Sequence, residues 1–139
     1  MTAKEFLEQY KDAIRAVDDL QAEYNKQQEQ IDQIRSALGG DGLPKSSAVR
    51  KEVEEKAIKL AEMAEEVLLA QAEALAVRQH VERVVRKIPG APGDVIRKHY
   101  IDLMKFEDVA EALGYSERQC YNLRDKGLDI IDELAKTFH

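Results

Sequence analysis

The side chains best suited to specific binding stand close together in the run YSERQCYNLRDKG, near the C-terminal end of the chain. Arginine, glutamine and asparagine side chains form paired hydrogen bonds with the edges of DNA bases, and glutamate accepts a hydrogen bond from cytosine. Such side chains reach the bases when they lie on the outward face of a helix whose first turns enter the major groove. The run therefore indicates base reading by Arg118, Gln119 and Asn122.

Two short helices joined by a tight turn must hold this set in position. Apolar residues recur at helical spacing over 106–113, and Gly114 follows the last of them, where a helix stop is expected. Ser116 begins the second helix, because a serine followed three residues later by Gln119 predicts a capping box. Cys120 falls on the inward stripe of that helix and is expected to be a buried packing residue. The pattern is typical of a helix-turn-helix; the alternative is a small three-helix cap with no DNA-binding role.

A basic segment precedes the two short helices. The chain has a net charge of −6, yet residues 78–98 carry six Lys or Arg against two Asp or Glu. Cations there can bind DNA phosphates and so fix the position of a reading helix, while a solvated basic helix face is an equal alternative. The expected phosphate contacts are Arg83, Arg86, Lys87, Arg97, Lys98, Ser116 and Lys126. Residues 99–139 carry nine acidic against five basic residues, which weakens the phosphate contribution to binding.

Two long amphipathic helices occupy the first part of the chain. Apolar residues are three and four positions apart over 7–38 and again over 53–88, and the glycine-rich run GGDGLPKSS at 39–47 separates the two stretches. A short connection forces neighbouring helices to run antiparallel, and helices of this length need a packing partner in water. We expect a homodimer or a higher homo-oligomer, because apolar residues also lie outside the main seam, at Leu68, Leu69, Leu75 and Val77.

Together these elements predict an all-α protein. Residues 1–88 are expected to form a long antiparallel two-helix coiled-coil hairpin that acts as an oligomerisation arm. Residues 89–93, PGAPG, are expected to be a linker, and residues 94–139 a three-helix domain that contains the helix-turn-helix. Asp94 is expected to cap the first helix of that domain, which should run to about Leu103.

The run YIDLMKFEDVAEALGYSERQCYNLRDKGL resembles region 4 of bacterial sigma-70-type factors, which binds a promoter element and the flap of RNA polymerase. The whole chain resembles a family encoded by phages and prophages of Gram-positive bacteria. The resemblance implies a transcriptional regulator that binds double-stranded DNA, with RNA polymerase as a further partner. The resemblance implies that Glu117, Arg118, Gln119, Tyr121 and Asn122, together with Lys126, occupy positions that face bases or phosphates. Leu103 and Lys105 depart from the pattern, which usually has a glycine and a Ser or Thr cap there.

The sequence contains no recognisable catalytic site, and we expect that the protein is not an enzyme. The single cysteine excludes an internal disulfide, and the three histidines His80, His99 and His139 lack the spacing of a zinc site, so we expect no metal and no cofactor. The paired glutamates lie in charge-dense helix and are expected to be solvated rather than catalytic. No apolar run is long enough to span a membrane, and no signal segment is evident at Met1, so we expect a cytoplasmic protein.

Two other functions are compatible with these residues. An acidic C-terminal domain favours a protein-interaction module that docks on RNA polymerase, while the helical arm recruits or blocks another factor. A small DNA-packaging subunit also couples a helix-turn-helix to an oligomerising arm. The leading prediction is the sequence-specific regulator, because the polar set stands at the start of a helix, where base edges are reached.

Overall fold

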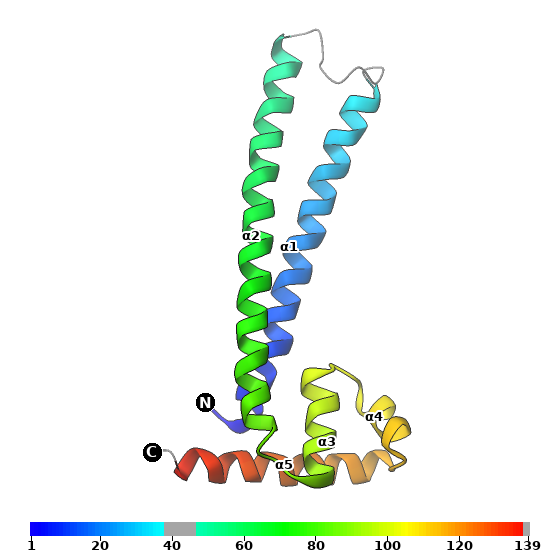
Figure 1. Cartoon of the computed structure of the whole chain (residues 1–139). Coiled ribbons are helices and arrows are strands. Elements are labelled where there is room, and N and C mark those ends of the chain that lie inside the picture. The colour runs from blue at the N-terminus through cyan, green and yellow to red at the C-terminus, as the bar shows by residue number, and fades with distance from the viewer. Residues whose placement is uncertain (38–46, 138–139) are drawn as a thin grey trace. The chain divides into compact units, whose positions relative to one another are not determined.

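The computed structural model describes residues 1–37 and 47–137, and these are almost entirely helical, with no strand among them. The elements are α1 (Ala3–Ala37), α2 (Ser47–Val85), α3 (Gly90–Ile96), η1 (Arg97–Ile101), α4 (Phe106–Leu113) and α5 (Glu117–Thr137) (Figure 1). The all-α class is therefore confirmed. The expected turn at 39–47 lies outside the described residues, apart from Ser47, where α2 begins. No described helix is long and apolar enough to cross a membrane.

The chain divides into two compact units. Unit 2 is Arg15–Ala72, and it contains one stretch from each of the two long helices, which run antiparallel (Figure 1). Ile31, Val53 and Val67 are its buried apolar residues, and all three belong to the seams that the spacing of apolar residues predicted. The buried residues of this unit therefore follow the predicted seams.

Unit 1 combines Met1–Ile14 with Glu73–His139. Its main core joins the first turns of α1, the C-terminal end of α2, the α3 and η1 segments, and α5. The residues of this core are Ala3, Leu7, Val81, Val85, Ile88, Ile96, Tyr100, Ile101 and Ile131. Burial of such side chains stabilises the unit by about 1.5 to 3 kcal/mol for each large one. The start of α1 is fixed by a reciprocal cap, in which the Glu5 N–H donates to Thr2 Oγ1 (3.1 Å) and the Thr2 N–H donates to Glu5 Oε2 (3.4 Å).

Two glycines allow backbone and side chains to approach closely in this core. A Cβ atom added to Gly127 of α5 would lie 2.6 Å from Cγ1 of Ile96, which is itself fully buried. A Cβ atom added to Gly93 would collide with the backbone carbonyl of Ile88. The helix that approaches Gly127 closely is α3.

Helix α3 begins at Gly90, so the predictions of an Asp94 cap and of a helix from Asp94 to Leu103 were wrong. The residue that precedes the helix is Pro89, which makes no side-chain capping bond. Pro92 is tolerated because it lies in the first turn, where backbone N–H groups have no partner within the helix. The PGAPG run therefore forms the start of a helix instead of an extended connection.

The helical segment after α3 also ends earlier than expected. It widens into the π-helix η1, which ends at Ile101, and Leu103 follows with a left-handed φ of 57°. That conformation costs about 1 to 2 kcal/mol for a residue with a Cβ atom. Leu103 therefore adopts a conformation that glycine would adopt without this cost.

Replacement of Gly127 by valine should destabilise the protein by roughly 1 to 3 kcal/mol, because the added side chain overlaps the position of Ile96. Urea denaturation followed by circular dichroism measures the loss. Asp129→Val is the matched control, since Asp129 is an exposed residue of the same helix and the substitution there tests only the helix preference of valine. Equal losses in the two variants would contradict a close contact at Gly127.

Candidate nucleic-acid interface

A short turn between α4 and α5 fixes the start of α5. Gly114 ends α4 with a left-handed φ of 74°, and the N–H of Tyr115 donates to the carbonyl oxygen of Ala110 at 3.0 Å. The N–H of Gln119 donates to Ser116 Oγ at 3.1 Å, while the N–H of Ser116 donates to Gln119 Oε1 at 2.9 Å. The predicted capping box is therefore confirmed. It satisfies two of the backbone donors that a helix N-terminus leaves without partners.

Small and apolar side chains connect α4 and α5 on their inner faces. Val95, Val109, Ala110 and Cys120 form a buried cluster. Burial is the main cause that raises the pKa of the Cys120 thiol, and the nearby charge of Glu117 acts in the same direction. Both effects disfavour the reactive thiolate, so the thiol serves packing, as the sequence predicted.

The polar set at the start of α5 faces outward. Glu117, Arg118, Gln119, Tyr121 and Asn122 are all exposed, while Cys120 between them is fully buried. The polar side chains therefore lie on the solvent-exposed face of α5, and the opposite face packs into the protein. It is the arrangement that a helix needs in order to enter a groove of a duplex.

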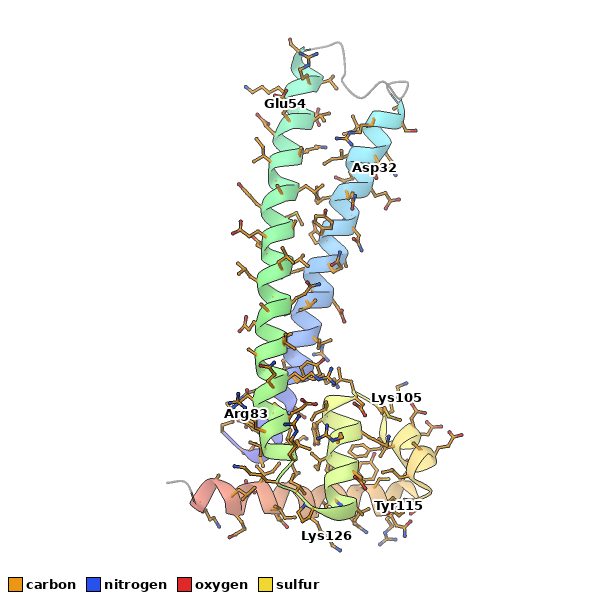
Figure 2. The ribbon with its side chains drawn as sticks, viewed as in Figure 1. Asp32, Glu54, Arg83, Lys105, Tyr115 and Lys126 are labelled. Carbon is orange, nitrogen blue, oxygen red and sulfur yellow. The ribbon has the colours of Figure 1, made fainter. Side chains whose placement is uncertain are left out.

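Part of the set lines a surface hollow of about 300 Å³. The hollow joins Gln119, Asn122 and Lys126 of α5 with Tyr115 in the preceding turn and Ala91 of α3; Figure 2 labels Tyr115 and Lys126. The structure therefore brings together three residues that the sequence predicted. Tyr115 was missed because it lies in the turn before α5, where helical spacing does not indicate which residues share a face.

Tyr121 lies beside an aromatic stack instead of in the hollow. Its ring is 4.5 Å from the ring of Phe106, and the Arg124 guanidinium lies over both rings, 5.3 Å from Phe106 and 5.1 Å from Tyr121. Arg124 also donates to Asp125 Oδ1 from Nε (3.1 Å) and Nη2 (3.0 Å). These contacts hold the Tyr121 ring against α4. Sequence reasoning did not find Arg124, because its contacts depend on how α4 and α5 cross.

His99 joins η1 to α4 within the same stack. Its ring lies 3.8 Å from that of Phe106 at an interplanar angle of 22°, and its Nδ1 is 2.7 Å from the carbonyl oxygen of Met104. Because a carbonyl only accepts, Nδ1 carries the proton in this bond. Burial is the main cause that lowers the pKa of His99, and the bond to Met104 opposes the shift. Lys11 and Arg124 lower the pKa further.

The carboxylate of Glu82 forms ion pairs with three arginines of the basic segment. Glu82 Oε1 lies 3.4 Å from Arg97 Nη1 and 3.8 Å from Arg78 Nε, and Glu82 Oε2 lies 3.9 Å from Arg86 Nη2. These groups are partly exposed and the distances are long, so each pair adds little to stability. Two of the expected phosphate contacts, Arg86 and Arg97, are thus directed toward Glu82.

The remaining basic residues of 78–98 are distributed differently. Arg83 is exposed on α2, Lys87 is exposed in the turn after α2, and Lys98 of η1 is half-buried. Among the described residues, those that line the hollow at α5 include none of the cations at 78–98. Figure 2 shows Arg83 on α2, apart from Tyr115 and Lys126. None of these cations therefore lines the hollow; of the expected phosphate contacts, Ser116 and Lys126 belong to the turn and helix that carry the polar set.

No protein-family model, curated protein or solved structure matches the chain. The function is therefore argued from the residues of α4 and α5 and from the surface that they form.

Protonation of His99 should destabilise unit 1. Burial lowers the pKa of His99 below its ordinary value of 6.5, so the unfolded chain takes up a proton at higher pH than the folded chain. The contribution of this histidine is therefore fully present above its unfolded pKa, and stability should fall as the pH drops below 6.5 and through the folded pKa.

Thermal melting between about pH 5 and pH 8 measures this effect. A His99→Phe variant keeps a ring against Phe106 but cannot titrate, so its melting temperature should depend less steeply on pH. The same decline in both proteins would show that another group is responsible.

Proposed function

We propose that the chain is a sequence-specific DNA-binding transcriptional regulator that places the start of α5 in the major groove. The observation that carries the proposal is the alternation at the start of α5, where exposed Arg118, Gln119 and Asn122 surround the buried Cys120. In this interpretation α4 and α5 form a helix-turn-helix, α3 and η1 precede it, and the long helices form a coiled-coil hairpin. The sequence resemblance to region 4 of sigma-70-type factors, and to a phage and prophage family, favours the same function.

Base reading would come from side chains of the first two turns of α5. The Arg118 guanidinium can donate two hydrogen bonds to guanine, and Asn122 can pair with adenine. Lys126 lies one turn beyond Asn122 along the same hollow, where it can bind a phosphate of the groove wall. The backbone N–H groups and the partial positive charge at the start of α5 add to the attraction for phosphate.

Acidic residues would limit binding to DNA of arbitrary sequence. Glu117 stands within the polar set, and Glu107, Asp108 and Glu111 are exposed on α4. Because phosphate attraction supplies most of non-specific affinity, these carboxylates lower it more than they lower the contribution of base contacts. The proposed regulator would therefore bind weakly without its cognate sequence, and it would act in the cytoplasm on a small number of sites.

The same acidic face supports a second candidate, a module that docks on RNA polymerase. The exposed carboxylates of α4 would face a basic surface of that partner. Pull-down of core polymerase from a nuclease-treated lysate distinguishes the two functions. Recovery that survives nuclease treatment favours direct docking, and recovery that requires DNA favours the regulator.

Arg118→Ala should weaken binding to the cognate duplex by about 1 to 3 kcal/mol and have little effect on random duplex, because a base contact contributes only at its own sequence. Lys126→Ala should weaken binding to both duplexes. It should also lower the slope of log affinity against log salt concentration by about 1, as expected for the loss of one phosphate contact. Selection from random duplexes supplies the cognate sequence, and fluorescence anisotropy at stated salt measures both affinities. An equal loss for Arg118→Ala on both duplexes would contradict base reading.

A further inference from the structure

One face of α2 exposes large apolar side chains on the side opposite its buried residues. α2 is one continuous helix over Ser47–Val85, so the order of residues along this face follows from helix geometry. The exposed fractions are 62% for Ile58, 66% for Leu68, 64% for Leu69 and 57% for Leu75. Side chains of this kind and number on one helix face normally have a partner.

These residues belong to a regular stripe. Positions three and four apart lead from Glu54 at one end to Arg83 at the other, and most of the residues between them are apolar. The stripe consists of Glu54, Ile58, Ala61, Glu65, Leu68, Leu69, Ala72, Leu75, Ala76, Gln79 and Arg83. We call it the outer stripe. Its alanines permit a second helix to approach closely.

The two ends of the outer stripe carry opposite charges that are not paired with other described residues. Glu54 and Arg83 are both exposed, both are labelled on α2 in Figure 2, and neither forms an ion pair with another described residue. Except for Leu75, which would face Glu62, the positions of the stripe are also symmetric about a point between Leu68 and Leu69. Reversal of the helix direction about that point places position 54 opposite 83, 61 opposite 76, and 68 opposite 69.

We propose that the outer stripe pairs with the outer stripe of a second copy of this chain in antiparallel orientation. Leu68 and Leu69 of the two copies meet at the two-fold axis, Ala61 faces Ala76, and Glu54 faces Arg83 at both ends. A parallel pair in register would instead place Glu54, Glu65 and Arg83 each against the same residue of the second copy. Like charges so placed repel, and the charge pattern therefore selects the antiparallel pair.

This inference goes beyond the proposed DNA-binding function, since the pairing requires no DNA. It specifies the expected self-association by naming its face, its direction and its axis. It also gives Arg83 a different ligand, a carboxylate of the second copy in place of a DNA phosphate. The stripe from Glu54 to Arg83 spans 29 helical steps, or about 44 Å at 1.5 Å per residue, which is enough for a stable helix pair.

A charge exchange tests the direction. Glu54→Arg and Arg83→Glu should each weaken the dimer roughly tenfold in low salt, because each changes two symmetric pairs from attraction to repulsion. The double variant E54R/R83E should restore wild-type association, since both pairs re-form with their charges exchanged. Glu55→Arg is the matched control, because Glu55 has the same charge and neighbours Glu54 but lies off the outer stripe. Sedimentation equilibrium of the full chain gives the dissociation constants.

A second substitution tests the face. Leu68→Asp together with Leu69→Asp should give a monomer that retains helical circular dichroism, because both side chains are exposed within a single copy. A wild-type chain that stays monomeric at high micromolar concentration would overturn the proposal. So would a dimer that the leucine substitutions do not weaken, or a charge exchange that fails to restore association. Because sedimentation is measured without DNA, failure of the DNA-binding proposal would leave these results unchanged.

Discussion

The crossing of α5 over α3 at Gly127 and Ile96 is the contact on which the rest of unit 1 depends. Ile96 is fully buried and belongs to the core that also holds Leu7, Val81 and Ile131. Since Gly127 has no side chain, the α5 backbone rests directly on Ile96. Protein interiors are packed as densely as organic crystals, so a shift at one contact displaces the neighbouring residues. The direction of α5, and with it the orientation of its first turns, is therefore set by a contact several residues away from the polar set.

The parts of the site that the sequence predicted are those fixed by neighbouring residues. The cap between Ser116 and Gln119, the stop at Gly114 and the inward position of Cys120 each depend on a few consecutive residues, and all three are present. The predicted helix at 106–113 is α4 with the same bounds. Local rules suffice for such features because backbone hydrogen bonds and helical period act over less than two turns.

The parts that the sequence did not predict depend on the way distant segments meet. The stack of His99, Phe106 and Tyr121 requires η1, α4 and α5 to converge, and no spacing within one helix reveals it. The ion pair between Arg97 and Glu82 likewise joins residues 15 positions apart. The early start of α3 was not predicted for a different reason: the prolines and glycines of PGAPG are typical of a linker, whereas a proline in the first turn of a helix breaks no hydrogen bond.

The capping box restricts what Gln119 can recognise. Its Oε1 atom accepts the N–H of Ser116 at the helix start, so the Nε2 group is the part of the amide that is directed to other partners. A paired contact with adenine uses both amide atoms and would compete with the cap, whose loss costs about 1 kcal/mol. Contacts that only require a donor, such as those with guanine O6 or thymine O4, leave the cap intact. In the proposed complex the cap would therefore disfavour the paired contact of Gln119 with adenine, and would leave only contacts in which Nε2 donates.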